Sequence, residues 1–304
     1  MATPKLANGN YYDNSRVYKY YAGYSDRFVI NQLTEIGKDS VLLDPWNGSG
    51  TTTLVASICG YNCYGYDINP VMVLVAKAKL YCSIPEDDLE ISDAVSKSRM
   101  KKHLVDTDKD PLCSWFDDDT AKAIRSLEKT LRVVCGNFSD ALMRLFANID
   151  AASPRLAFYY VVLFELLRDY TSSFSTSNPT WIKVADDQKA KIAKTYSEIS
   201  RDYMACFKRL SLLVTAPIKT DSTIIHTGDS RSIQLTDQII DGAITSPPYC
   251  TRIDYAIYTR VELALIGYDS SEFNSVRKQM IGTPTIHAFD FSVVQGQTSS
   301  NTLT

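Results

Sequence analysis

The segment 40–58 reads SVLLDPWNGSGTTTLVASI, and it decides the fold. It begins with the compact apolar run 40–43, which is bounded by turn residues and predicts a buried strand. Residues 52–58 are patterned as a helix, and Gly48 and Gly50 in the loop between let the backbone pass close to a ligand. Strand, glycine-containing loop and helix in this order predict the first unit of a parallel α/β sheet.

The same pattern recurs along the chain. A helix capped by Ser25 and ended before Gly37 is predicted ahead of the first strand. Pro70 suits the first turn of a helix after the second strand. The remaining predicted elements are strands at 62–66, 223–226 and 242–245 and helices at 71–80 and 253–266. Together they predict an α/β fold with a parallel sheet.

The region between the second and third strands has a different character. Amphipathic helices are predicted from the apolar spacing in 121–134 and 192–210. A polar and aromatic stretch, 170–183, is long for a bare connection and is therefore a candidate for function. We expect three parts, namely 1–82 and 220–304, which build the α/β domain, and 83–219, a large helical insertion.

The ends of the four predicted strands carry the polar residues of interest. In a doubly wound sheet, ligands bind at the carboxyl ends of the strands. An acidic side chain such as Asp44, next to the glycine loop, can meet a positively charged or amino-bearing group, and Asp67 sits where ribose hydroxyls need a bidentate acceptor. The first loop lacks the third glycine of a dinucleotide-binding fingerprint, which weakens the hypothesis that the chain binds a nicotinamide cofactor. For Asp67 and Asp229, helix capping is the plain alternative.

The fourth strand runs into Thr245–Tyr249, which reads TSPPY. Two consecutive prolines fix the backbone, so their carbonyls point in defined directions. The Ser246 hydroxyl and the Pro247 carbonyl could accept both N–H groups of an exocyclic amine, and Tyr249 could stack on the base. Reaching such a base inside a duplex requires flipping it out of the stack. The plain alternative is an ordinary proline-containing turn.

The pair of segments DPWNGSGTT (44–52) and TSPPY (245–249) resembles motifs I and IV of the amino-group DNA methyltransferases. The resemblance implies a Rossmann-like methyltransferase fold, S-adenosyl-L-methionine as cofactor, and duplex DNA with a flipped base as partner. In that family the SPPY form is associated mostly with cytosine N4, so Ser246 favours cytosine N4 and leaves adenine N6 open. The implied setting is bacterial restriction-modification or defence.

The resemblance also implies which residues form the site. The catalytic residues would be Ser246, Pro247, Pro248 and Tyr249. The cofactor would be held by residues of motif I, by Asp67 at its ribose, by Asp229 near its adenine, and by a segment similar to motif X. The motif I residues are Asp44, Trp46, Asn47, Gly48, Gly50 and Thr51, and those of the motif X-like segment are Tyr24 and Phe28.

Several features depart from the family pattern. Trp46 stands where the family usually has Phe, and the insertion lies before motif III, which is not the usual place for a DNA-contacting region. Only 268–304 follows the last predicted helix, with at most one more strand near 285–294, so we expect the C-terminal strands to be incomplete. A second polypeptide could complete them. Two alternatives therefore stay open: an RNA methyltransferase acting on guanine N2 or adenine N6, and a partner-dependent or non-catalytic DNA-binding subunit.

Composition narrows the remaining function classes. The 304 residues carry a formal net charge of −3, with a sequence pI near 5.7, so nucleic-acid contact must rely on a local patch. The seven cysteines include no CxxC pair, which argues against a zinc site or a secreted disulfide framework, and we expect no metal. No apolar run approaches membrane-spanning length, so we expect a cytoplasmic protein without membrane contact.

Overall fold

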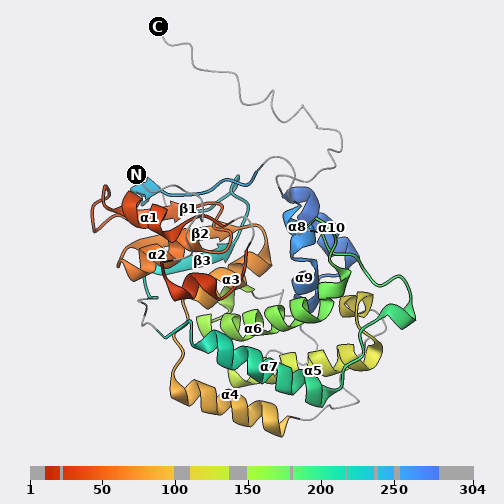
Figure 1. The fold of residues 1–304 in the computed structure, drawn as a ribbon. Coiled ribbons are helices and arrows are strands. Elements are labelled where there is room, and N and C mark those ends of the chain that lie inside the picture. Colours follow the sequence, from red (N-terminus) through yellow and green to blue (C-terminus); the bar gives the residue numbers. More distant parts are fainter. Residues whose placement is uncertain are drawn as a thin grey trace.

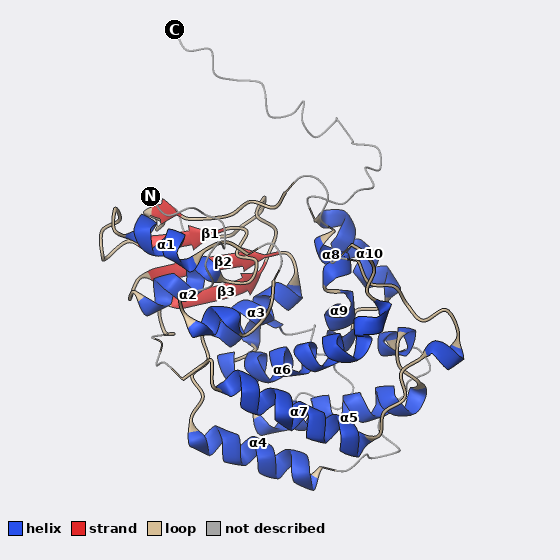
Figure 2. Ribbon diagram, viewed as in Figure 1, coloured by secondary structure: helices blue, strands red, loops and turns tan. Residues whose placement is uncertain are grey.

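A computed structural model describes residues 11–20, 23–98, 110–136, 149–178, 181–215, 218, 220–235, 239–249 and 254–280. Its centre is a four-stranded sheet in the order β3-β2-β1-β4, in which every neighbouring pair is parallel (Figures 1 and 2). The strands are β1 (Val41–Asp44), β2 (Asn62–Asp67), β3 (Thr223–Thr227) and β4 (Gly242–Ala243). The predicted α/β fold with a parallel sheet is confirmed. The strand order reverses direction at β1, which is where ligands bind in such sheets.

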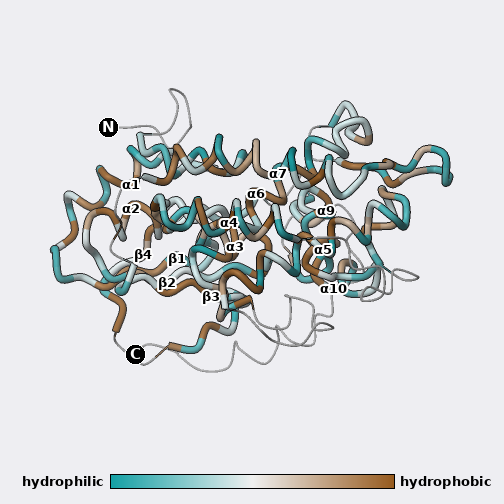
Figure 3. Tube along the Cα trace, turned by 90° about the horizontal axis from the view of Figure 1, so that it is seen from below, coloured by the Kyte–Doolittle hydropathy of each residue, from teal (hydrophilic) through white to brown (hydrophobic). Residues whose placement is uncertain are grey.

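Helices cover one face of this sheet. The three helices are α1 (Asp26–Leu33), α2 (Thr51–Ile58) and α3 (Pro70–Lys79). Leu42 and Cys63 point toward α1 and α2, where they join Val29 and Val55 in a buried cluster. Figure 3 shows the strands along one side of the trace, with α1 and α2 on the other. The sheet is therefore backed by a helical layer that leaves the carboxyl ends of the strands free.

A second helical layer lies beneath α3. It contains α4 (Pro85–Lys97), α5 (Asp118–Val134), α6 (Pro154–Tyr170) and α7 (Tyr196–Ser211). Helix α6 packs against both α3 and α7 (Figure 1). All ten residues of α3 are buried, because the sheet lies on one side of the helix and α6 on another. The helices of 83–219 thus share one hydrophobic core with the α/β part.

A third group of helices follows β4. It comprises α8 (Tyr255–Tyr258), α9 (Arg260–Ile266) and α10 (Ser270–Gln279). Helix α9 packs on α6 and on the short helix η2 (Pro111–Ser114), and Gly267, at φ 105°, ends it. In Figure 1 this group stands beside the sheet, on the side of the strand ends. It is therefore placed to form a wall opposite those ends.

Some predicted boundaries were wrong. Ile192 does not lie on α7 but pairs with Phe116, because a capping box between Thr195 and Glu198 starts that helix at Tyr196. The helix predicted for 253–266 is two helices with a break at Thr259. Helix α1 ends at Leu33 instead of just before Gly37, and β4 has only two residues of the predicted strand 242–245. Helix α6 and the short helix η4 (Thr171–Phe174) were not predicted. The possible strand 285–294 lies outside the described residues.

None of the described helices combines the length and the hydropathy that a bilayer crossing requires.

Candidate functional site

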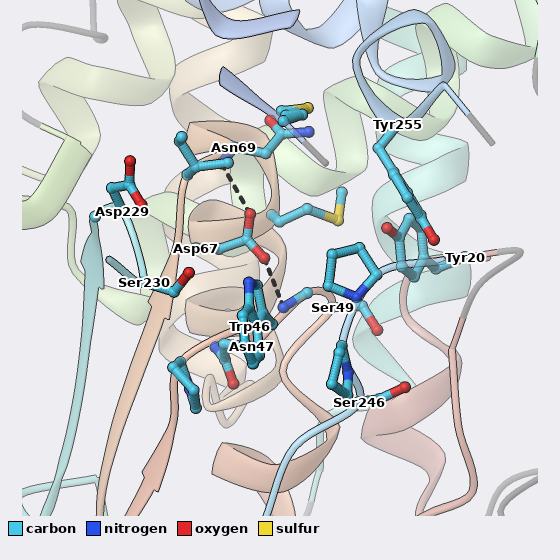
Figure 4. A pocket seen from close by; sticks show the side chains of 18 of the residues that line it. Tyr20, Trp46, Asn47, Ser49, Asp67, Asn69, Asp229, Ser230, Ser246 and Tyr255 are labelled. Atoms are coloured by element: carbon cyan, nitrogen blue, oxygen red, sulfur yellow. Dashed lines mark hydrogen bonds between the residues drawn. The ribbon is translucent and has the colours of Figure 1, made fainter. Parts of the chain in front are cut away.

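A cavity opens between the strand ends and the wall made by α8 and α10 (Figure 4). The loops after all four strands contribute to one side of it, and Tyr20, Tyr255 and Met280 contribute from elsewhere. The side chains and backbone that line it belong to Tyr20, Gly23, Tyr24, Pro45, Trp46, Asn47, Gly48, Ser49, Thr51, Asp67, Ile68, Asn69, Met72, Gly228, Asp229, Ser230, Arg231, Ser246, Pro247, Pro248, Tyr249, Tyr255, Gln279 and Met280. The structure thus brings the glycine loop and the TSPPY loop, nearly 200 residues apart, to one cavity.

Asp67 is anchored at the end of β2 by backbone hydrogen bonds. Its Oδ2 accepts from the Gly48 amide at 2.8 Å, and its Oδ1 accepts from the Asn69 amide at 2.8 Å (Figure 4). Burial raises the pKa of Asp67 to about 6, although these two bonds oppose the rise. The helix-capping alternative is wrong here, since the Asn69 side chain caps α3. The carboxylate is thereby held rigidly with part of its surface open to the cavity.

Asp44 lies fully buried beneath the loop. Its Oδ1 accepts from the Thr245 hydroxyl at 2.5 Å and from the Trp46 amide at 3.2 Å, but its Oδ2 has no hydrogen-bond partner among the described residues. Burial raises the pKa of Asp44 to about 6, with the Thr245 hydrogen bond the largest opposing effect. The Nδ2 of Asn47, a residue that lines the cavity, is likewise buried and without a described partner. Unpaired buried polar atoms carry a free-energy cost, which makes these two atoms exceptions in the packing beneath the loop.

The TSPPY loop is fixed at both ends. Thr245 is tied to Asp44 at the start of the loop, and the Thr52 hydroxyl donates to the Ile244 carbonyl at 3.0 Å. At the other end the Tyr249 amide donates to the Tyr255 hydroxyl at 3.1 Å. Tyr249 remains 66% exposed, so its ring is free to contact a ligand. The loop therefore presents Ser246 and Pro247 at the cavity from a fixed backbone.

Three of the predicted cofactor residues do not line the cavity: Asp44, Gly50 and Phe28. Gly50 has φ 78°, and a Cβ there would lie 2.5 Å from the Cβ of Ala76, so this glycine allows α2 and α3 to approach closely. Phe28 packs edge-on against Tyr24, 6.3 Å between ring centroids. Tyr24 does line the cavity and shares a hydrogen bond with the Thr52 hydroxyl.

The predicted residue Asp229 lies at the cavity after β3. Its carboxylate accepts from the backbone and side chain of Arg231, with Nε 3.0 Å from both oxygens, and this guanidinium holds the pKa of Asp229 below its usual range. The helix-capping alternative is wrong for Asp229 too, because no helix begins after it within the described part of 228–241. The carboxylate therefore stays ionised beside the cavity.

Sequence reasoning missed the residues that form the opposite wall. Tyr20, Tyr255 and Met280 lie in no recognisable motif, and only the fold brings them to the strand ends. Asn69 was also missed. Its Nδ2 donates to the Thr259 hydroxyl at 2.9 Å and so links the end of β2 to the junction of α8 and α9. The one available signal was an asparagine before Pro70, which is typical of a helix N-cap rather than of a cavity.

Comparison with known proteins gives one informative similarity. The chain is 23% identical over 286 residues to the Type II methyltransferase M.BsoBI of Geobacillus stearothermophilus, an alignment that covers 86% of this chain and 54% of that protein. The chain therefore spans about half the length of the curated relative it matches. No protein-family model and no solved structure matches the chain.

Proposed function

We propose that this chain is an S-adenosyl-L-methionine-dependent DNA methyltransferase that modifies an exocyclic base amine, with cytosine N4 as the favoured target. The observation that carries the proposal is the single cavity shared by the glycine loop at Gly48 and the TSPPY loop at Pro247. The similarity to a Type II methyltransferase supports the same class of activity. The biological setting would be bacterial restriction-modification or defence, in the cytoplasm.

The side of the cavity near β1 and β2 fits the proposed cofactor. Asp67, fixed by two backbone N–H groups, is suited to accept from a ribose diol. Asn47, which lines the cavity, would serve the polar groups of the methionine portion, and Asp229 the adenine portion. Gly48, at φ 50°, keeps the loop free of a side chain beside them. When bound there, the cofactor would supply an electrophilic methyl group on a sulfonium.

The side near the TSPPY loop fits a base amine. The Ser246 hydroxyl and the Pro247 carbonyl can each accept one N–H of the amine and so orient its nitrogen lone pair. The exposed Tyr249 ring can stack on the flipped base. No acid or base is required to activate the amine, so the chain contributes to the rate mainly by positioning and electrostatics.

The test is a methyl-transfer assay with labelled S-adenosyl-L-methionine on DNA and RNA, followed by nucleoside mass spectrometry. We expect N4-methylcytosine in DNA. Ser246→Ala should lower kcat by roughly tenfold or more, the loss expected for one positioning hydrogen bond in a transition state, with cofactor affinity unchanged. Ser96→Ala, on the exposed face of α4, is the matched control. N6-methyladenine alone would move the target to adenine, methylated RNA alone would favour the RNA alternative, and no product would contradict the proposal.

One observation favours a second candidate, a subunit that needs a partner polypeptide. One row of paired residues crosses all four strands on the face opposite α1–α3, and it consists of Ala243, Leu43, Tyr64 and Ile224. Ile224 is 40% exposed and the other three are at least partly exposed in the described structure. Parallel sheets are usually covered on both faces. A chain that binds the cofactor in titration calorimetry, yet transfers methyl groups only after a second protein is added, would support this candidate.

A further inference from the structure

Two arginines from the helical insertion contact α9, the helix that follows α8. Arg168, on α6, forms an ion pair with Glu262 of α9, whose side chain is 1% exposed. Arg125, on α5, donates to the Ala264 carbonyl at 2.9 Å and to the Leu265 carbonyl at the end of α9. Both arginines therefore contact α9 from the insertion, Arg168 in the first turn of the helix and Arg125 in the last.

Only Arg168 also contacts segments that reach the cavity. Its guanidinium lies between the rings of Tyr18 and Tyr258, 4.4 and 4.3 Å from their centroids. It donates to the Tyr258 hydroxyl at 2.9 Å and to the Lys19 carbonyl at 3.3 Å. The Tyr258 hydroxyl in turn donates to the Lys19 carbonyl at 2.8 Å. One side chain thus joins α6, α8, α9 and the segment that precedes Tyr20.

Two short connections lead from this cluster to the cavity. Tyr258 lies one helical turn after Tyr255, whose hydroxyl accepts from the Tyr249 amide of the TSPPY loop. Lys19 is followed by Tyr20, which packs edge-on against Tyr258 and whose ring would be 3.8 Å from a Cβ placed on Gly48. A shift of the cluster would therefore move Tyr20 and Tyr255, which both line the cavity, relative to Ser246 and Pro247.

We propose that Arg168 is a positioning residue for the target-binding side of the cavity, acting through Tyr258 and Tyr255 on the TSPPY loop. This role rests on the methyltransferase function proposed above. It gives the insertion a task that the sequence did not indicate, since α6 supports the wall that faces the strand ends. Arg168 touches neither the target nor the cofactor in this arrangement, because it does not line the cavity.

The test compares Arg168→Lys with the matched variant Arg125→Lys. A lysine keeps the positive charge but loses the planar fork that serves several acceptors at once. For Arg168→Lys we expect KM for DNA to rise and kcat to fall by roughly tenfold or more, because small misplacements at a reacting centre have effects of this size. The dissociation constant of S-adenosyl-L-methionine should change by less than KM for DNA, since Asp67 is held by the Gly48 and Asn69 amides and not by Arg168 or Tyr258. Arg125→Lys should leave KM and kcat unchanged.

Two further measurements keep the proposal falsifiable. Arg168→Met leaves Glu262 buried without its partner and is prone to misfolding, so the double variant Arg168→Met/Glu262→Met removes the charge pair together. Hydrogen exchange of the peptide 244–249 reports on the loop without any substrate, and it should be faster in both Arg168 variants but not in Arg125→Lys. Equal losses in Arg168→Lys and Arg125→Lys, or wild-type kinetics and exchange in the Arg168 variants, would overturn the role. A wild-type chain that methylates nothing would refute the proposed function itself.

Discussion

The Asp67 carboxyl group, which lines the cavity, predicts a dependence of cofactor affinity on pH. Burial raises the pKa of Asp67 to about 6. This carboxylate should accept hydrogen bonds from the cofactor, whose sulfonium and ammonium charges favour the ionised form. Lowering the pH from 7 to 5 should therefore weaken binding, because the carboxyl group must lose a proton that it holds at pH 5.

The magnitude follows from that pKa value. A group with a pKa about 6 is roughly nine-tenths ionised at pH 7 and one-tenth at pH 5, so the requirement for the Asp67 carboxylate costs about tenfold in affinity, or ~1.4 kcal/mol. The effect of the same pKa on the folding stability of the ligand-free chain has the opposite sign. Because the pKa is raised in the folded state, the stabilisation is full below the unfolded value near 4 and is lost as the pH rises through about 6. A loss of folding stability caused by this group in acid therefore cannot mimic the predicted loss of affinity.

Titration calorimetry with S-adenosyl-L-methionine at several pH values between 5 and 8 measures the effect. Asp67→Asn should bind more weakly at pH 7 and should lose most of the pH dependence between pH 5 and pH 7, because its amide cannot ionise. Ser96→Ala, remote from the cavity, should follow the wild type. A wild-type dissociation constant that is the same at pH 5 and pH 7, or an Asp67→Asn variant with the full wild-type slope, would refute the reasoning.

Two further substitutions test the packing around the site. Gly50→Ala should destabilise the fold by ~2–4 kcal/mol in thermal unfolding, since the residue has φ 78° and the new Cβ would lie 2.5 Å from Ala76. The control Gly60→Ala, at φ 82° with open space around it, should cost only ~1 kcal/mol. Equal losses in the two variants would contradict the packing argument. Thr245→Val should lower the free energy of unfolding in urea by ~1–3 kcal/mol, because it removes the hydroxyl that donates to Asp44. Thr245→Ser, which keeps that hydroxyl, should retain most of the wild-type stability. A Thr245→Val variant as stable as the wild type would show that the bond contributes little.

The sheet was largely predictable because its signals are local. The strand predicted for 40–43 is β1 at 41–44, and the loop that follows it contains the glycines that its sharp path requires. Asp67 and the TSPPY loop were recognisable because rigid or acidic residues directly after a strand have few structural roles. Each of these signals can be identified from a few neighbouring residues of the sequence.

Helix α6 was missed because its central part has no polar side. Amphipathic spacing identifies a helix by the alternation of buried and exposed residues, but α6 is buried from Leu156 to Phe164 without a break between α3 and α7. For α7 the same apolar spacing predicted too long a helix, because the predicted start at 192 lies before the observed start at Tyr196. There the apolar residue Ile192 extended the helical spacing, although the capping residues Thr195 and Glu198 marked the true beginning.

The opposite wall of the cavity could not be predicted for a different reason. Tyr20, Tyr255 and Met280 reach the cavity from three separate segments, and each is an ordinary aromatic or apolar residue in its local context. The role of Arg168 is even less visible, because it depends on a buried glutamate 94 positions away along the chain. Only the packing of α6 against α9 brings them together.

Helix α3 determines how the molecule can come apart. None of its residues faces water, and the ammonium of Lys77 donates to the carbonyls of Ile149, Asp150 and Ala152, in the segment leading into α6. Undocking the insertion would expose a predominantly apolar helix surface and leave this cation without its acceptors. The sheet and the helical layer should consequently melt in one cooperative transition, and a protease cut between them should not release a stable half.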